Sequence, residues 1–114
     1  MRRERLYLAD MLEAADAVQH FIAGSKREQF ADNDLLRSAV LQKLTLIGEA
    51  AARLPKEIQE RHPDIPWTDI VGFRNIAVHA YFAVDWNIVW TTATIDLPEL
   101  TTALRALLAQ EFPE

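Results

Sequence analysis

Residues 34–54, DLLRSAVLQKLTLIGEAAARL, decide the fold class, because their apolar side chains recur in alternating steps of four and three. This spacing lines up one face of an α-helix, whereas a strand lines up every second side chain. The apolar seam consists of Leu36, Val40, Leu44, Ile47, Ala51 and Leu54. Asp32 or Asn33 can cap its start, and Pro55 ends it. The sequence therefore predicts a long helix over 34–54.

The residues before this seam predict two further helical elements. Residues 3–23 place their apolar side chains on one helical face, and Gly24 stands where a C-terminal cap belongs. That face consists of Leu8, Met11, Leu12, Ala15, Val18 and Ile22. Residues 25–28, SKRE, have the form of a capping box, in which a hydroxyl residue is followed three positions later by glutamate. We therefore expect a helix over 3–23 and then a single helical turn.

The stretch after Pro55 predicts a short exposed segment and then an unusual helix. Residues 55–64 are charged and flanked by prolines, which is typical of a short exposed helix or a loop. A third long helix is expected from Pro66 to about Ala80, because proline suits a first helical turn. Its apolar residues form two stripes, with Trp67, Ile70, Val71, Ala77, Val78 and Tyr81 in one and Phe73, Ile76 and Ala80 in the other. Since the stripes cover most of its circumference, this helix is expected to be central in a bundle.

The last segment is rich in β-branched residues over 88–95, IVWTTATI, which favour strands. Helical periodicity nevertheless extends from Trp86 to Leu107, and Asp85 is available as its cap. The stripe consists of Trp86, Val89, Trp90, Ala93, Leu97, Leu100, Leu104 and Leu107. Pro98 is expected to bend or restart this helix, with Asp96 capping its second half. The three tryptophans fall on apolar stripes and are expected to pack in the core.

Composition supports one all-α domain over residues 1–114. Half of the 114 residues are apolar and a quarter are charged, as in soluble globular proteins, and there are only three glycines. The absence of cysteine excludes disulfides and thiolate metal sites. Asp10 and Glu13 interrupt the apolar run that a signal peptide needs, and no stretch approaches the ~20 apolar residues of a membrane span. We expect a cytoplasmic protein with no membrane partner.

The net charge of −5 limits which nucleic-acid contacts are plausible. Long-range attraction of a phosphate backbone has the wrong sign, so any contact must come from a local basic site. We therefore expect no sequence-specific DNA binding. His20 and His62 are expected at the surface, and no histidine or carboxylate spacing is typical of a metal site.

Arg74 is the polar residue that stands out, because it lies in line with apolar positions of the third long helix. A buried guanidinium is costly unless it is paired or faces a polar ligand. In an ideal helix His79 lies about 140° round from Arg74, whereas Tyr81 returns to within about 20° of it. His79 can join the other two only if the last turn distorts or a second chain contributes. The competing interpretation is an arginine that reaches the surface and a histidine bonded to a backbone carbonyl.

Several blocks of sequence, taken in order, resemble the HepT-like toxin family of the HEPN superfamily. They are residues 47–51 (IGEAA), 54–55 (LP), 62–63 (HP), 65–67 (IPW), 74–82 (RNIAVHAYF), 84–85 (VD), Trp90 and 96–100 (DLPEL). The most specific block is Arg-x-x-x-x-His-x-Tyr, filled by Arg74, His79 and Tyr81. The resemblance extends over nearly the whole chain.

The resemblance implies a HEPN-like antiparallel bundle of four to five helices that forms a homodimer and cleaves RNA without a metal or other cofactor. It also implies a partner, an antitoxin of the minimal nucleotidyltransferase (MNT) type. By position, Arg74 and His79 are the nuclease pair, and Tyr81 is the residue that the antitoxin modifies with AMP. Asn75 is a candidate for an assisting role. Glu49 matches a recurrent position whose role is either assisting or structural.

The chemistry of these side chains suits RNA cleavage by the adjacent 2′-hydroxyl. A neutral imidazole at His79 can accept the hydroxyl proton, and the permanent charge of Arg74 can stabilise the charge that develops on the phosphate. One chain supplies one such histidine and no separate general acid. A two-fold dimer would bring two copies of His79 and Arg74 into one cleft.

Two other hypotheses remain open at the level of sequence. The chain could be a non-catalytic helical partner of a nucleotidyltransferase that presents a nucleotide to it, with Arg74 as a phosphate contact. It could also be a housekeeping dimer in which the motif is an interface network. The intact pair of Arg74 and His79 favours the nuclease, whereas the acidic composition favours the non-catalytic partner.

Overall fold

The computed structural model describes residues 2–113, which form an all-α protein, and none of them lies in a strand. The elements are α1 (Arg2–Ile22), α2 (Arg27–Ala31), α3 (Asp34–Arg53), α4 (Lys56–Arg61), α5 (Trp67–His79), a 3-10 turn η1 (Tyr81–Ala83), α6 (Trp86–Thr91), a π-helical segment η2 (Thr92–Asp96) and α7 (Leu97–Glu111). The all-α expectation is confirmed. No helix within residues 2–113 has both the length and the apolar character needed to cross a lipid bilayer.

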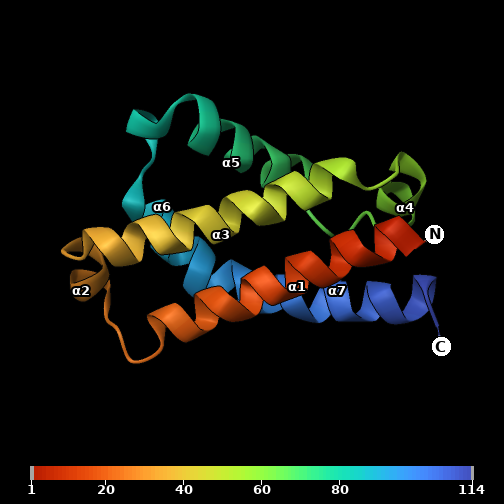
Figure 1. Cartoon of the computed structure of the whole chain (residues 1–114), viewed down its shortest axis with the longest axis horizontal. Coiled ribbons are helices and arrows are strands. Elements are labelled where there is room, and N and C mark those ends of the chain that lie inside the picture. The colour runs from red at the N-terminus through yellow and green to blue at the C-terminus, as the bar shows by residue number, and fades with distance from the viewer. Residues whose placement is uncertain (1, 114) are drawn as a thin grey trace.

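The four long helices, α1, α3, α5 and α7, run alternately in opposite directions (Figure 1). Helix α3 packs against α1 on one side and against α5 on the other, and α1 also packs against α7. The largest fully buried side chains come from α1, α2, α3, α6 and α7, and they are Leu8, Met11, Val18, Phe30, Val40, Val89, Leu97, Leu104 and Leu107. The core therefore lies between α1, α3 and the continuous helical segment formed by α6, η2 and α7, here called the α6–α7 arm.

Three of the expected caps are present. Gly24 follows α1 with φ +77°, in the left-handed region that glycine adopts without steric cost. The side chain of Asn33 accepts a hydrogen bond from the backbone N–H of Leu36 at 3.0 Å. Asp85 accepts one from the backbone N–H of Asn87 at 2.9 Å. These contacts fix the end of α1 and the starts of α3 and α6 near the expected residues.

The single turn after α1 begins one residue later than the capping box predicted. Lys26, not Ser25, occupies the N-cap position of α2, and its backbone N–H donates to the side chain of Gln29 at 2.7 Å. The assignment of Ser25 and Glu28 to the box was therefore wrong, because glutamine at 29 offers the same side-chain oxygen one position further on.

The expected N-cap at Asp96 is wrong, because the helix does not restart there. The backbone of Asp96 is helical, its side chain makes no capping bond, and the N–H of Leu97 bonds to the carbonyl of Thr92, five residues earlier. This wider π turn precedes Pro98, which lies in the first turn of α7. The buried residues here are Val89, Ala93, Leu97 and Thr101, each four apart. Regular α spacing would rotate each by about 40° from the last, so the wider turn keeps them on one face.

Helix α5 is not central, contrary to expectation. Only Trp67 and Ala77 are buried along it, while Ile76 and Val78 are each 47% exposed. Helix α3 is the element that packs along it. Apolar residues around a helix predict burial, but the described part of the chain supplies only one layer to cover them. The remaining apolar faces of α5 are open.

Candidate functional site

Arg74 on α5 and Glu49 on α3 form an ion pair between two adjacent helices. One carboxylate oxygen, Oε1 of Glu49, accepts from Nε of Arg74 at 2.8 Å and from Nη2 at 2.5 Å. The side chains are 26% and 35% exposed, respectively, so the pair lies at the rim of the helix packing. Charge-assisted bonds of this kind set the plane of the guanidinium as well as its position.

Asn75 completes the contacts of this guanidinium. Its side-chain oxygen accepts from Nη1 of Arg74 at 2.8 Å. Because a guanidinium has five N–H donors, two donors remain for another ligand. The structure thus brings together three of the residues singled out by sequence, Arg74, Asn75 and Glu49.

His79 is the last residue of α5 and is exposed to solvent. Within residues 2–113 its ring makes no hydrogen bond or ion pair. His79 lies five residues beyond Arg74 on the same helix. In an ideal helix this spacing points the two side chains in different directions, about 140° apart. Because His79 is exposed, its ring is accessible to a ligand from solution.

An ideal helix predicted that Tyr81 shares the helical face of Arg74. The structure differs, because Tyr81 lies outside α5. The α-helical path ends after His79, and Ala80 has φ −139° and ψ 50°. Tyr81 instead opens η1, where its ring packs edge-on against Trp86 at 6.3 Å between centroids and against Phe82 at 5.9 Å. Tyr81 remains 45% exposed. An ideal helix continued to Tyr81 would return it to the face of Arg74, but α5 ends at His79.

Trp86 connects Tyr81 to the core. Its ring lies 6.4 Å from that of Phe30, which is buried, and the guanidinium carbon of Arg37 lies 5.1 Å from its centroid on a ring face. Sequence reasoning missed Arg37, because nothing in the local pattern of α3 predicts contact with a residue 49 positions later. The tryptophans do pack as expected, with Trp67 buried and Trp86 and Trp90 half-buried.

A second ionic cluster lies where α4 meets the end of α7. Glu111 accepts from Arg61 at 2.6 and 2.9 Å and pairs with Nε2 of His62 at 2.9 Å. These hydrogen bonds lower the pKa of Glu111 to about 2. His62 is only 9% exposed, so its expected surface position was wrong. Its carbonyl also accepts from the indole of Trp67 at 3.0 Å, which makes this cluster a joint between α4, α5 and α7.

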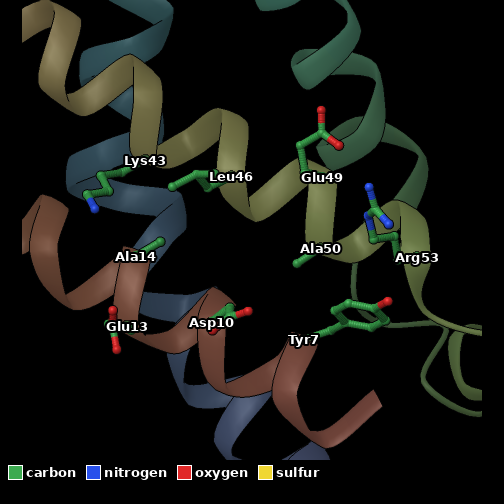
Figure 2. Close-up of a pocket in the computed structure, with 9 residues that line it drawn as sticks. All are labelled: Tyr7, Asp10, Glu13, Ala14, Lys43, Leu46, Glu49, Ala50 and Arg53. Atoms are coloured by element: carbon green, nitrogen blue, oxygen red, sulfur yellow. The ribbon is translucent and has the colours of Figure 1, made fainter. Parts of the chain in front are cut away.

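Two grooves lie along α3, and Glu49 lines the smaller of them. The groove between α1 and α3 has a volume of about 280 Å³, and Figure 2 shows Tyr7 and Arg53 within it and the carboxylate of Glu49 turned towards α5. Its walls mix acidic and basic side chains. The larger groove, of about 590 Å³, lies between α3, α5 and the α6–α7 arm. Its charged lining residues are all acidic and comprise Asp64, Asp69, Asp96 and Glu99, which disfavours a phosphate there.

Comparisons with known proteins agree on one family. The model of the family described as "Ribonuclease HepT-like" matches residues 11–107. "Putative RNase TTE0752" of Caldanaerobacter subterraneus subsp. tengcongensis is 34% identical over 111 residues, covering 97% of this chain and 99% of the relative. "Putative RNase MJ1216" of Methanocaldococcus jannaschii is 38% identical over 96 residues, covering 84% of this chain and 79% of the relative.

The name of a third relative includes HepT, the term that also describes the family. "Probable ribonuclease HepT" of Thermococcus cleftensis is 34% identical over 99 residues, which cover 87% of this chain and 90% of the relative. No solved structure matches the chain. The match to the family model and the near full-length relatives show that the chain belongs to the HepT-like ribonuclease family.

Proposed function

We propose that this chain is the metal-independent endoribonuclease toxin of a HepT/MNT-type toxin–antitoxin pair, folded as a single HEPN-like domain and active as a homodimer. The observation that carries the proposal is the state of Arg74. Glu49 and Asn75 fix its guanidinium, yet leave two N–H donors for a phosphate. His79, exposed at the end of the same helix, supplies an imidazole that can accept a proton from a substrate hydroxyl.

The proposed reaction is transfer within the RNA strand. His79 accepts the proton of a 2′-hydroxyl, whose oxygen attacks the adjacent phosphorus and forms a 2′,3′-cyclic phosphate. Arg74 stabilises the extra negative charge on the phosphate oxygens as the bond to the 5′-oxygen breaks. The leaving 5′-oxygen takes a proton from a protonated histidine, a role that His79 of a second protomer can fill.

The open faces of α5 support the dimer. Several large apolar side chains on α5 and on the elements after it are exposed. They are Ile76 and Val78 on α5, Phe82 on η1, Ile88 on α6 and Ile95 on η2. Apolar side chains gathered beyond what a monomer can cover indicate a protein interface. A two-fold contact through these elements would place two copies of Arg74 and His79 close together and concentrate positive charge on an acidic protein.

Tyr81 is the proposed acceptor of AMP from an MNT-type nucleotidyltransferase antitoxin. It lies two residues beyond His79 and is 45% exposed, so a group on its hydroxyl would stand close to the proposed site. AMP would add bulk and a phosphodiester charge that competes with RNA for Arg74.

The second candidate is a non-catalytic partner of a nucleotidyltransferase, favoured by the net charge of −5 and by the acidic lining of the larger groove. Both features disfavour RNA over most of the surface. The two candidates therefore differ in the role of Arg74, which stabilises a reacting RNA phosphate in the first and holds the phosphate of a nucleotide in the second.

Cleavage of RNA in the presence of EDTA tests the proposal. The wild type should cleave, and Arg74→Ala and His79→Ala should each lose about 10²-fold or more in rate. His20→Ala is the matched control, because His20 is also exposed at a helix end. Absence of cleavage by the wild type would favour the non-catalytic partner. Activity of His79→Ala within a few-fold of wild type would refute its role as the base.

A further inference from the structure

Gly48 on α3 lies directly beneath Arg74 on α5. A Cβ built on Gly48 would stand 2.3 Å from Cβ of Arg74, 3.1 Å from its Cγ and 3.1 Å from the backbone oxygen of Ile70. Carbon atoms in contact are ordinarily about 3.5–4.0 Å apart. The two helices therefore approach here more closely than any residue with a side chain would allow.

This overlap cannot be relieved by turning a side chain. Cβ of Arg74 is attached to the backbone, and the oxygen of Ile70 is part of it, so neither atom moves unless α5 moves. Separating the two Cβ atoms to ordinary contact requires a displacement of about an ångström or more. The guanidinium at the end of the Arg74 side chain would move with its helix.

We propose that Gly48 is a positioning residue for Arg74, an inference that rests on the function proposed for Arg74. The missing side chain at 48 admits the aliphatic part of Arg74 against α3. The carboxylate of the next residue, Glu49, then meets its guanidinium at 2.8 and 2.5 Å. The adjacent glycine and glutamate thus act as a pair, the first setting the distance between helices and the second setting the plane of the guanidinium.

The chain offers a matched control in Gly72. It is also helical, lies on α5 only two residues from Arg74, and has no heavy atom within 4 Å of an added Cβ. Replacing either glycine with alanine raises helix propensity by the same amount. Any difference between Gly48→Ala and Gly72→Ala therefore reports the contact at Gly48 and not the loss of a helical glycine.

The first measurement follows the Nε–H of Arg74 by proton–nitrogen NMR, which does not depend on activity. In the wild type and in Gly72→Ala, its bond to Glu49 should slow exchange with water. In Gly48→Ala that protection should disappear. RNA cleavage by Gly48→Ala should fall about 10²-fold, the scale expected for displacing a group in a reacting site by about an ångström. Gly72→Ala should cleave within a few-fold of wild type.

Gly48→Ala with Nε–H protection intact and cleavage equal to that of Gly72→Ala would overturn the inference. If wild type does not cleave RNA, the proposed function fails, while the NMR comparison still tests whether Gly48 places Arg74. Should Gly48→Ala fold poorly, thermal unfolding of double variants decides. Each double variant is compared with its own single variant at position 74, because glycine lowers helix propensity relative to alanine. Gly48→Ala should lower Tm much less in the Arg74→Gly background, which lacks the opposing Cβ, than in the Arg74→Ala background, which retains it. An equal fall in Tm in the two backgrounds would contradict the proposed contact.

Discussion

A single oxygen of Glu49 accepts two hydrogen bonds from Arg74, through Nε at 2.8 Å and Nη2 at 2.5 Å. The side-on edge of the guanidinium is thereby turned towards α3. One N–H on each terminal nitrogen, Nη1 and Nη2, is left without a partner among residues 2–113. The carboxylate therefore both orients the guanidinium and pairs with its charge.

Loss of this contact should slow cleavage without unfolding the protein. Glu49→Ala is expected to reduce the single-turnover rate by tenfold to about 10²-fold, because Arg74 loses the group that fixes its plane. Glu49→Gln keeps an acceptor oxygen and should lie between wild type and Glu49→Ala. Glu13→Ala, an exposed glutamate on α1, is the control and should match wild type. Equal rates for Glu49→Ala and the control would show that Glu49 has no orienting role.

Tyr81 should be the residue that receives AMP. Co-expression with an active MNT-type nucleotidyltransferase should add mass in whole AMP units to the peptide that contains Tyr81. Tyr81→Phe keeps the ring that packs against Trp86, so it should retain cleavage within a few-fold of wild type yet escape neutralisation. Tyr7→Phe removes the other tyrosine and should be neutralised normally. AMP found only on Tyr7 would contradict the assignment.

A charge on the open face of α5 should separate the dimer. Ile76→Lys places a cation where an apolar partner surface is proposed, and desolvating it there is costly. Light scattering at micromolar concentration should show a dimer for wild type and a monomer for the variant, with cleavage lost in parallel. Leu35→Lys, at a residue 81% exposed near the start of α3, should remain dimeric. A wild type that is monomeric and active on RNA would rule out the shared site.

The joint at Glu111 should make stability depend on pH in the acid range. Because folding lowers the pKa of Glu111 from 4.5 to about 2, its contribution is complete above about pH 4.5 and is lost as pH falls towards 2. Glu111→Gln should cost about 2 kcal/mol at pH 7, as expected for hydrogen bonds to charged groups. The Tm difference from wild type should shrink below pH 4.5 and vanish near pH 2. Exposed Glu99→Gln should show no such difference at any pH.

Local pattern predicted the helices well because their determinants lie within a few residues of one another. The cap at Asn33 and the seam that follows it are both readable within α3, and the cap at Asp85 is readable within α6. The capping error at Asp96 had a different cause. A π turn depends on how a helix fits the core beyond it, which the neighbouring sequence does not record.

Contacts between distant residues account for what the sequence left out. His62 is buried where it pairs with Glu111, which lies 49 positions later in the chain. The Arg74–Glu49 pair likewise joins residues 25 positions apart. The Gly48–Glu49 dipeptide is part of the block at residues 47–51 that resembles the family. Its contact with Arg74 could not be predicted, because the contact depends on which helix packs against α3. The misplacement of α5 at the centre arose similarly, because apolar periodicity does not reveal whether the covering surface belongs to the same chain.

The π turn over Thr92–Asp96 holds one residue more than a regular helical turn. Removing one residue there would let the backbone close as a regular α-helix, so that Leu104 and Leu107 would keep their phase towards α1. Removing one residue from the regular part of α7 would instead rotate everything beyond it by about 100°. This segment should therefore tolerate a one-residue deletion that α7 does not.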